Sequence, residues 1–424
     1  MRYCVLGKKL SHSLSPTIHA DYFRRYGVSG EYCKKEVSEG EWERIGEIIR
    51  DYDGLNVTVP YKEKIISVLD EIRGDAKVLG AVNTVVKEGD RYVGYNTDTY
   101  GFEALLRYND IQVKGKTCVV LGSGGASKSV VYCLEQAGAD KVLVVSRTPS
   151  GKQISYGQLK DIEGYLIVNT TPVGMSPNVG VSPVDKDVLS NFQVAVDVVY
   201  NPSMTEFLKI ASEQGLYIAN GLYMLVAQAV KSQEYWQNIE VDESWVEQEY
   251  ERLKINFDVN SGNNIYLVGM MGCGKTTVGK ALGKAMGRKF VDSDGEIEKQ
   301  RGKSIPQIFE SEGEEAFRKY ESEVLSQLSR SKGLVVATGG GIVKNSINVA
   351  MMRASGSVVW LNRNPHLIVG DCDTSNRPLL KGKSQNVLSI FEERKPLYKS
   401  SADLEIVNDA GVAECLKKIK EVLR

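Results

Sequence analysis

Two short stretches of the chain carry the residue types that proton transfer and phosphoryl transfer require. In NVTVPYK, residues 56–62, an extended run stops at a proline, and Lys62 follows at the start of an expected helix. A lysine at a strand end can hold a proton over a cleft, although a solvated lysine in a first helical turn is the simpler interpretation of this stretch alone. The second stretch, GMMGCGKT at residues 269–276, fits GxxxxGK[ST] in full. Its backbone N–H groups would wrap phosphate, Lys275 would reach the outer phosphates, and the Thr276 hydroxyl suits Mg²⁺.

A glycine-rich loop, GSGGAS at residues 122–127, lies between an apolar run and a helix-like segment, and a second apolar run follows. It fits GxGxxG with a serine in place of the third glycine, and such a loop lets backbone N–H groups approach a pyrophosphate at a helix N-terminus. The second run ends in Ser-Arg-Thr at 146–148 without the carboxylate that an NAD site uses. Arg147 therefore favours the 2′-phosphate of NADP, although a surface arginine after a strand is the alternative. The expected NADP contacts are Gly122, Gly124, Gly125, Ala126, Ser146, Arg147, Thr148, Thr170 and Gly221.

Acidic, basic and glycine residues in the second half of the chain are further candidates for ligand binding. In FVDSD, Asp292 and Asp294 are two residues apart, so they share a face if the extended geometry continues beyond the strand. VVATGGG ends in three glycines at 339–341, where bare backbone can approach a ligand. Three arginines are available for anionic groups, although each by itself could form only a surface ion pair: Arg318, Arg377 and Arg394.

Alternating strand-like and helix-like segments must position these residues, which predicts an α/β fold. A chain of 424 residues exceeds what one core usually organises, so two or three domains are expected. The polar stretch DVNSGNN at 258–264 is the expected linker between them. The expected divisions are a substrate-binding part at about 1–98 and 222–257, a Rossmann NADP-binding part at about 99–221, and a P-loop domain at 265–424.

Bulk composition excludes several classes of function. A formal net charge of −1 provides no field that would recruit nucleic acid or an anionic membrane surface. Seven scattered cysteines make no CxxC pair and no metal-ligand spacing with the three histidines, which favours reduced thiols. The N-terminal stretch lacks the long apolar core of a signal peptide, and no run is long enough to span a membrane. We expect a cytoplasmic protein with small-molecule substrates, and its oligomeric state stays open.

Eight separated motifs over residues 1 to about 255 are similar to shikimate dehydrogenase: SHSLSP, NVTVPYK, GAVNT, GYNTD, GSGGAS, NTTPVGM, DVVYNP and LVAQA. The resemblance implies reduction of 3-dehydroshikimate by NADPH, with Lys62 and Asp98 as the catalytic pair. It also implies that neutral polar side chains bind the substrate: Ser13, Ser15, Asn56, Thr58, Asn83, Tyr200 and Gln228. These residue types fit the chemistry, because neutral donors and acceptors bind a polyhydroxylated carboxylate without burying net charge. Hydride transfer to a ketone also needs a proton donor beside the developing alkoxide. Taken singly, the two serines could cap a helix and Asn83 and Asp98 could be turn residues.

Residues 262 to 424 resemble shikimate kinase, a P-loop α/β domain like the nucleoside monophosphate kinases. The resemblance implies phosphorylation of shikimate by ATP, with Lys275 and Arg377 as catalytic residues and Arg377 on a mobile lid. The implied ATP contacts are Gly272, Cys273, Gly274, Lys275, Thr276 and Thr277. The implied shikimate contacts are Asp294, Arg318, Gly339, Gly340, Gly341 and Arg394. Thr276 and Asp292 are implied to hold Mg²⁺, the aspartate through water.

Two departures from these family patterns bear on the nucleotides. The segment from Arg147 to Val168 is shorter than usual, and Lys152 is the candidate for a basic residue that the family carries there. HLIVGDCDTSN, at 366–376, has no arginine where the kinase family usually places one near the adenine. Three alternatives stay open: a quinate-preferring dehydrogenase, a silent NADP-binding sensor that regulates the kinase, and a P-loop kinase for gluconate or a nucleotide. The favoured hypothesis is two autonomous active sites with free diffusion of shikimate between them.

Overall fold

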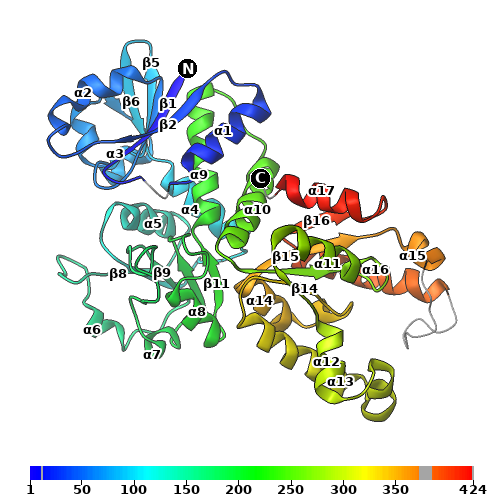
Figure 1. The fold of residues 1–424 in the computed structure, drawn as a ribbon. Helices are drawn as coiled ribbons and strands as arrows, with labels where there is room; N and C mark the ends of the chain where they lie inside the picture. Colours follow the sequence, from blue (N-terminus) through cyan, green and yellow to red (C-terminus); the bar gives the residue numbers. More distant parts are fainter. Residues whose placement is uncertain (11–12, 372–383, 423–424) are drawn as a thin grey trace. The chain divides into compact units, whose positions relative to one another are not determined.

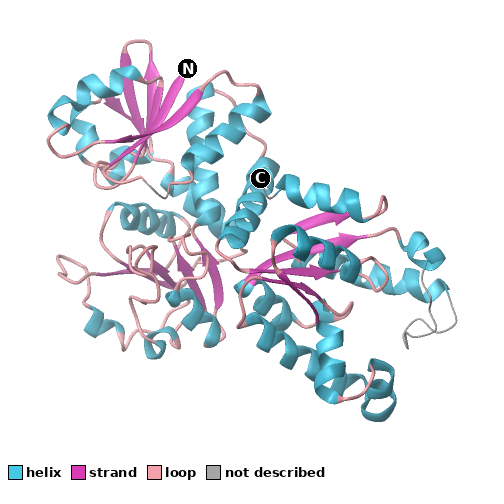
Figure 2. Cartoon of the chain, in the orientation of Figure 1, coloured by secondary structure: helices cyan, strands magenta, loops and turns pink. Residues whose placement is uncertain are grey.

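The computed structural model describes residues 1–10, 13–371 and 384–422, and it contains three β-sheets with helices packed around them (Figures 1 and 2). The chain divides into two compact units, Met1–Tyr250 and Glu251–Arg424. The first unit holds two of the sheets and the second unit holds the third. The predicted α/β fold class is confirmed, since strands alternate with helices in both units. No helix in the described ranges combines the length and the apolar character needed to cross a bilayer.

The first sheet is mixed and has six strands in the order β2-β1-β3-β5-β6-β4. Its strands are β1 (Arg2–Gly7), β2 (Glu31–Glu36), β3 (Gly54–Val57), β4 (Glu71–Ile72), β5 (Thr84–Glu88) and β6 (Arg91–Tyr95). The associated helices are α1 (Ser15–Tyr26), α2 (Ile45–Ile48) and α3 (Asp75–Leu79), with 3₁₀ helices η1 (Trp42–Arg44), η2 (Ile49–Asp51) and η3 (Lys64–Val68). β1 and β3 are parallel neighbours, and β5 runs antiparallel to β3. Asn56, near the C-terminal end of β3, therefore lies opposite Thr84, the first residue of β5.

The second sheet is entirely parallel, in the order β11-β10-β9-β7-β8. Its strands are β7 (Thr117–Leu121), β8 (Lys141–Val145), β9 (Leu166–Asn169), β10 (Val194–Asp197) and β11 (Tyr217–Asn220). Its helices are α4 (Asp98–Tyr108), α5 (Gly125–Gln136), α6 (Tyr156–Leu159), α7 (Lys186–Leu189), α8 (Glu206–Glu213) and α9 (Leu222–Gln237). The chain moves outward to β8 and returns across β7 to β9, so the strand order reverses at β7 and β9. In open α/β sheets, ligands bind beyond the carboxyl ends of the strands at such a switch point.

The third sheet is also parallel, in the order β13-β14-β12-β15-β16. Its strands are β12 (Asn264–Val268), β13 (Lys289–Asp292), β14 (Leu334–Ala337), β15 (Gly356–Asn362) and β16 (Leu404–Val407). Its helices are α11 (Lys275–Met286), α12 (Ser293–Arg301), α13 (Ile305–Ser329), α14 (Ser346–Ser355), α15 (Pro365–Asp371), α16 (Ser384–Ser401) and α17 (Val412–Val422), with the 3₁₀ helix η4 (Ile342–Lys344). β12 and β14 are buried throughout, as expected for central strands covered on both faces. The three strands β12, β13 and β14 are neighbours, so the loops after them share one edge of the sheet.

The predicted linker at 258–264 differs from the structure, because α10 (Glu243–Asn260) extends into it and β12 begins at Asn264. The polar side chains of this stretch are used inside the protein. Asn263 donates its side-chain N–H to Asp258 Oδ1 over 3.0 Å, and Ser357 Oγ donates to Asp258 Oδ2 over 2.8 Å. The stretch is polar because its residues bond one another and β15, and the two compact units separate earlier, after Tyr250.

Candidate active sites

Lys62 and Asp98 form a sheltered ion pair in the first unit, with 2.6 Å between Nζ and Oδ2. Asp98 begins α4, and its side chain is 9% exposed against 15% for Lys62. The expected helix at Lys62 is wrong: Lys62 lies in a turn before η3. Its carbonyl oxygen accepts from the backbone of Val82 over 2.8 Å, outside any helix, and this bond fixes the turn against the loop that precedes β5.

Asn83 holds the second oxygen of the Asp98 carboxylate. Its Nδ2 donates to Asp98 Oδ1 over 2.8 Å, and its Oδ1 accepts from the backbone N–H of Thr97 over 2.7 Å. Gln228, from α9, brings its Oε1 to 3.4 Å from the same Nδ2. Because each Asp98 oxygen has a donor, the carboxylate is oriented and Lys62 is oriented by it. The structure thus brings four of the predicted residues together.

Asn56 also lies in this region, but its carboxamide bonds to other protein groups. Its Oδ1 accepts from the hydroxyl of Tyr32 over 2.8 Å, and its Nδ2 donates to Ser232 Oγ over 2.9 Å. The side chain is 6% exposed. The predicted substrate contact at Asn56 stays a prediction, and the structure gives this residue a bracing role beneath the site.

The remaining predicted substrate contacts lie on three separate segments of the first unit. Ser13 Oγ accepts from the backbone N–H of Ser15 over 3.3 Å, and Ser15 begins α1. Burial raises the pKa of Tyr200, and a hydrogen bond with the backbone of Leu14 opposes that rise and places Tyr200 near the same turn. Thr58 follows β3, and its backbone N–H donates to the Leu6 carbonyl over 2.9 Å.

The glycine loop after β7 lies at the switch point of the second sheet, beside Lys62. Gly122 has φ +104°, and a Cβ there would lie 2.9 Å from Thr170 Oγ1. Thr170 follows β9, and its hydroxyl donates to the Leu121 carbonyl over 2.6 Å. A Cβ on Gly125 would lie 3.8 Å from Lys62 Cδ, whereas one on Gly124 would meet nothing within 4 Å. The loop therefore presents open backbone at the start of α5, next to the proton-bearing residue.

The segment after β8 bears the predicted 2′-phosphate contacts. Ser146 is buried and its Oγ accepts from the backbone N–H of Thr148 over 3.3 Å, whereas Arg147 and Thr148 are exposed. Ile154 returns to bridge Val145 in parallel register, so the shortened segment folds back on β8. Lys152 lies in the exposed turn between these points.

The two other predicted NADP contacts belong to helix starts. Ala126 lies in the first turn of α5, and Gly221 precedes α9. A Cβ on Gly221 would lie 2.0 Å from the carbonyl oxygen of Val198. Backbone packing alone therefore requires glycine at position 221.

The phosphate loop connects β12 to α11 and is braced from within the second unit. Lys275 Nζ donates to the carbonyl oxygens of Gly269 over 2.8 Å and Met270 over 2.9 Å. Gly274 has φ +98°, and a Cβ there would lie 2.7 Å from Asn408 Nδ2. Asn408 in turn donates to the Cys273 carbonyl over 2.7 Å. Of the other predicted ATP contacts, Gly272 accepts from Arg363 Nη1 over 3.2 Å, and Thr277 is exposed on α11.

The predicted metal residues meet at the start of α11. Thr276 Oγ1 donates to Asp292 Oδ2 over 2.8 Å, so a hydroxyl and a carboxylate face one point beside the phosphate loop. Oxygen ligands of these two kinds suit Mg²⁺, and the donor set therefore fits the implied metal. Asp292 and Asp294 were expected to share a face if the extended geometry continued beyond the strand, and it does not continue. Asp292 ends β13, and its Oδ1 accepts from the backbone N–H of Asp294 over 3.2 Å. This hydrogen bond caps α12, which begins at Ser293.

The three glycines after β14 are surrounded by the other residues predicted to bind shikimate. A Cβ on Gly339 would lie 2.9 Å from Asp294 Oδ1, and one on Gly341 would lie 2.5 Å from both terminal nitrogens of Arg318. Arg394 Nη1 donates to the Gly340 carbonyl over 3.1 Å. A Cβ on Gly340 would also lie 3.3 Å from the backbone nitrogen of Met271 in the phosphate loop. A side chain at position 339 or 341 would therefore displace the Glu321, Asp294 or Arg318 side chains, and Gly340 lies where the cradle adjoins the phosphate loop.

Glu321, one turn after Arg318 on α13, is a buried residue of this cradle that the sequence analysis missed. Its Oε2 accepts from Arg318 Nη1 over 2.9 Å, while its Oε1 would lie 2.4 Å from a Cβ on Gly339. Among the described residues, neither this Oε1 nor Asp294 Oδ1 has a hydrogen-bond partner. Burial raises the pKa of Glu321 to about 7, against the opposing effect of Arg318. Burial and then Asp292 raise the pKa of Asp294 to about 6. Two unpaired carboxyl oxygens beside bare backbone fit a ligand that donates hydroxyl hydrogens.

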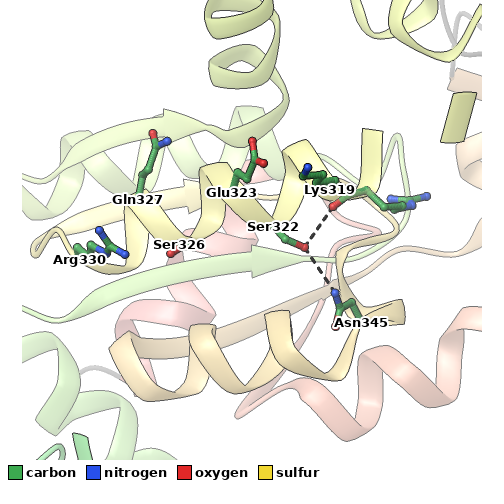
Figure 3. A pocket seen from close by; sticks show the side chains of 8 residues that line it. Lys319, Ser322, Glu323, Ser326, Gln327, Arg330 and Asn345 are labelled. Carbon is green, nitrogen blue, oxygen red and sulfur yellow. Dashed lines mark hydrogen bonds between the residues drawn. The ribbon is translucent and has the colours of Figure 1, made fainter. Parts of the chain in front are cut away.

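A groove of about 710 Å³ runs along α13 beside the start of α14 (Figure 3), and none of the three glycines lines it. Its lining residues are Arg318, Lys319, Ser322, Glu323, Ser326, Gln327, Arg330 and Asn345. Ser322 accepts from Asn345 Nδ2 over 3.5 Å and donates to the Arg318 carbonyl over 3.1 Å. Arg318 is the one predicted site residue in the lining of this groove. We therefore place the candidate shikimate site at the three glycines and not in the groove.

Further residues that the sequence analysis did not single out lie among the predicted ones. In the first unit these are His19, Tyr32, Thr84, Thr97, Ser232 and Gln233. In the second unit Tyr398 donates to the Gly340 carbonyl over 2.5 Å. Thr84 and Thr97 stand inside the motifs GAVNT and GYNTD, which could have signalled them. Arg377, the predicted lid residue, lies outside the described residues.

Comparisons with known proteins match different families to the N-terminal and C-terminal parts of the chain. Residues 5–85 match the family model "Shikimate dehydrogenase substrate binding domain", and residues 271–424 match "Shikimate kinase". A shikimate dehydrogenase (NADP(+)) of Clostridium perfringens strain 13 is 43% identical over 267 residues, which are 60% of this chain and 98% of the relative.

Solved structures resemble the same part of the chain. Shikimate dehydrogenase 1 from Peptoclostridium difficile has a TM-score of 0.58 and 43% identity, covering 60% of this chain and 98% of that one. Shikimate 5-dehydrogenase from Thermus thermophilus, solved with NADP(H) and shikimate, has a TM-score of 0.54 and 34% identity, covering 59% of this chain and 99% of that one.

The fold and the two sites define an oxidoreductase joined to a P-loop kinase, and both recognised families are confirmed. The chain belongs to the shikimate dehydrogenase family, and its C-terminal part is a shikimate kinase domain.

Proposed function

We propose that the first unit reduces 3-dehydroshikimate to shikimate with NADPH and that the second unit phosphorylates the 3-hydroxyl of shikimate with ATP. The observation that supports the reduction is the Lys62–Asp98 pair, with 2.6 Å between Nζ and Oδ2, beside the open glycine loop at Gly125. The second half is supported by the cradle of three glycines next to the phosphate loop. Free thiols at six described cysteines fit a reducing compartment, which supports the cytoplasm as its location.

In the reduction, bound NADPH supplies a hydride to the carbonyl carbon. Lys62 Nζ gives a proton to the carbonyl oxygen as negative charge develops on it, so the ketone becomes an alcohol. Asp98 holds the ammonium in place, and Asn83 holds the other oxygen of Asp98. Ser13, Ser15 and Tyr200 gather at the start of α1, where they can bind the hydroxyl and carboxylate groups of the ring. Arg147, exposed after β8, favours NADP over NAD.

In the phosphorylation, Lys275 and the loop N–H groups hold the phosphates of ATP. Thr276 and Asp292 would hold Mg²⁺, which supplies charge neutralisation for the transferred group. Asp294 accepts a hydrogen bond from the 3-hydroxyl and orients it, since its Oδ1 faces Gly339. Arg318 and Arg394, on either side of the glycines, bind the carboxylate. We keep Arg377 as the proposed residue that closes over the phosphates.

The test is a reciprocal pair of substitutions in the full chain. Lys62→Ala should lower the turnover of NADPH with 3-dehydroshikimate by about 10²–10⁴-fold, the usual contribution of a positioned acid, and leave ADP release with shikimate unchanged. Lys275→Ala should do the converse. Two exposed lysines on neighbouring segments provide matched controls, Lys64→Ala and Lys280→Ala, and neither should change either rate by more than about twofold. Loss of both activities in one folded variant would refute separate sites.

We further propose that shikimate diffuses freely between the two sites. Fusion raises the local concentration of one site near the other without requiring channelling. Adding a separate shikimate kinase during coupled turnover should then divert part of the product. A coupled reaction with no lag that the added enzyme leaves unchanged would contradict free diffusion.

A further inference from the structure

A buried hydrogen-bond network lies beneath the reduction site and includes groups to which the proposed mechanism gives no role. At its centre is the Asn56 carboxamide, and beside it lies His19, which is fully buried on α1. The His19 ring stacks on Tyr32 with 4.1 Å between ring centroids and packs against Trp236 at 5.3 Å. This packing fixes the plane of the imidazole, so its two nitrogens point at fixed partners.

The partners determine which nitrogen of His19 carries the proton. Nε2 lies 3.1 Å from Asn56 Oδ1, and a carboxamide oxygen can only accept, so Nε2 donates. Nδ1 lies 2.7 Å from Gln233 Nε2, and a carboxamide nitrogen can only donate, so Nδ1 accepts. A neutral imidazole protonated at Nε2 satisfies both contacts. Burial is the larger influence on this ring and lowers the pKa of His19 to about 3.

The carboxamide of Asn56 is held in one orientation from both ends. Oδ1 accepts from His19 and from the Tyr32 hydroxyl, while Nδ2 lies 2.9 Å from Ser232 Oγ, 3.2 Å from Thr84 Oγ1 and 3.3 Å from the carbonyl oxygen of Asn83. Turning the amide over would place its oxygen against the Asn83 carbonyl and its N–H groups against the donor of His19. Either contact would be repulsive, so the Asn83 carbonyl, which can only accept, and the Nε2–H of His19 together hold this orientation.

From Asn56 the network reaches both ends of the proposed substrate site. In one direction Thr84 Oγ1 lies 3.1 Å from Asn83 Oδ1, and Asn83 donates to Asp98, the partner of Lys62. In the other direction the Ser15 side chain is close enough to the Tyr32 hydroxyl to oppose the larger effect of burial, which raises the pKa of Tyr32. One carboxamide thus connects the serine proposed to bind the ring substituents with the pair proposed to deliver the proton.

We propose that His19 is a positioning residue for the reduction: as a neutral donor it fixes the Asn56 carboxamide, which aligns Ser15 and the Lys62–Asp98 pair on one substrate. This inference rests on the proposed reductase function and deepens it. It assigns His19 no contact with substrate and no proton transfer.

The kinetic test replaces His19 with an aromatic ring that lacks both nitrogens. His19→Phe should lower kcat for 3-dehydroshikimate reduction by about tenfold or more, because a misplaced proton donor acts in the transition state. The KM for NADPH should stay within about twofold, since no hydrogen bond among the described residues joins the glycine loop to His19 or Asn56. His19→Gln, which can both donate and accept, should recover part of kcat. The shikimate kinase rate of the same chain measures the protein concentration, and the tryptophan signals of the first unit measure its folded fraction.

The matched control is Tyr22→Phe, on the same helix. Tyr22 is fully buried, and among the described residues its hydroxyl has no hydrogen-bond partner. Its loss should leave the reduction unchanged. A wild-type kcat in His19→Phe, a loss that only follows the folded fraction, or an equal loss in Tyr22→Phe would each overturn the proposal.

A second measurement is independent of activity. Nitrogen NMR of ¹⁵N-imidazole-labelled protein has only three histidines to assign. His19 should show the neutral form protonated at Nε2, without titration from about pH 5 to pH 8, where exposed histidines titrate. An ordinary titration or the opposite tautomer would overturn the network. If the wild type shows the expected tautomer yet does not reduce 3-dehydroshikimate, the proposed function fails, and the positioning role fails with it.

Discussion

The C-terminal half of α10 carries a lysine whose charge is buried in the second unit. Lys254 Nζ lies 2.7 Å from Asp403 Oδ2 and 3.7 Å from Asp258 Oδ2, and its side chain is 11% exposed. Burial by itself would lower the pKa of Lys254, but the two carboxylates outweigh it and hold that pKa above the ordinary value. Both carboxylates also accept from β15, Asp403 from the backbone N–H of Val358 over 2.7 Å and Asp258 from Ser357 Oγ over 2.8 Å. This lysine therefore lies between two acids that both bond β15, Asp258 on α10 and Asp403 directly before β16.

Replacing Lys254 with methionine keeps the length of the side chain and removes its charge. Breaking a buried pair from one side costs roughly 3–5 kcal/mol, because the remaining charge is left uncompensated. The two hydrogen bonds from β15 still stabilise the carboxylates, so we expect about 3 kcal/mol for Lys254→Met, near the lower end. In a unit of this size that lowers the melting temperature by roughly 6–12 °C.

The two units can be followed separately by fluorine NMR of protein labelled with 5-fluorotryptophan. The chain has four tryptophans, and Trp360 alone belongs to the second unit. In urea titrations, Lys254→Met should lower the unfolding free energy reported by Trp360 and leave the other three signals unchanged. Lys299→Met is the matched control, because that side chain is 77% exposed and its ion pair with Glu296 is long, at 3.7 Å. This substitution should lower the unfolding free energy by less than about 1 kcal/mol.

Two results test whether Lys254 compensates the charges of Asp258 and Asp403. If the Trp360 signal of Lys254→Met unfolds within about 1 kcal/mol of the wild type, Lys254 does not compensate the two acids as argued. A double variant that also carries Asp403→Leu should recover part of the loss, because it removes one of the uncompensated charges. The same logic predicts that a kinase fragment beginning at Glu251 is more stable than one beginning at Asn264, which lacks Lys254.

Three further predictions concern single side chains. Arg147→Ala should raise the KM for NADPH about fivefold to tenfold by removing a charge-assisted contact, and leave the KM for NADH unchanged; an equal rise for both would contradict a 2′-phosphate contact. The pKa of His19 is about 3 when folded and ordinarily 6.5, so the unfolded chain takes up a proton below pH 6.5, and the first unit loses stability as pH falls there, by up to about 1.4 kcal/mol per pH unit. His19→Phe should remove that slope in urea titrations read from the tryptophans of the first unit, and an unchanged slope would contradict the buried neutral ring. The pKa of Glu321 is about 7 when folded and ordinarily 4.5, so the folded protein keeps the proton longer, and this residue costs stability as pH rises from about 4.5 to 7. Above that range Glu321→Gln should be more stable than the wild type by about 1–3 kcal/mol at the Trp360 signal, and a less stable variant at pH 8 would contradict a raised pKa.

Contiguous motifs were predictable because their geometry is local. The phosphate loop needs glycine at positions such as 274, where φ is +98°, and its lysine and threonine follow within two residues. The same holds for Gly122 in the second sheet. In each case a strand, a tight glycine turn and a helix start occur together in the sequence, and their order already places backbone N–H groups at a helix N-terminus.

Local geometry also misled the prediction, and two cases besides the turn at Lys62 show why. Asp292 and Asp294 would share a face if the strand continued, but the Asp292 carboxylate accepts from the backbone N–H of Asp294 and caps a helix there. The stretch 258–264 reads as a solvated linker, yet Asp258 is 3% exposed. The sequence shows that such residues are polar, whereas only the fold determines whether water or a buried partner satisfies them.

The amino-acid sequence by itself determined the fold class, both families and most residues proposed to touch the reacting groups, because these lie in short motifs with their own backbone geometry. The tertiary structure alone decided what holds them. His19 meets Gln233 across 214 positions, and Asn56 meets Ser232 across 176. Neither pairing has a local signal, since a buried hydrogen bond between distant residues depends on how helices and sheets pack, and the periodicity of one element does not specify its partner.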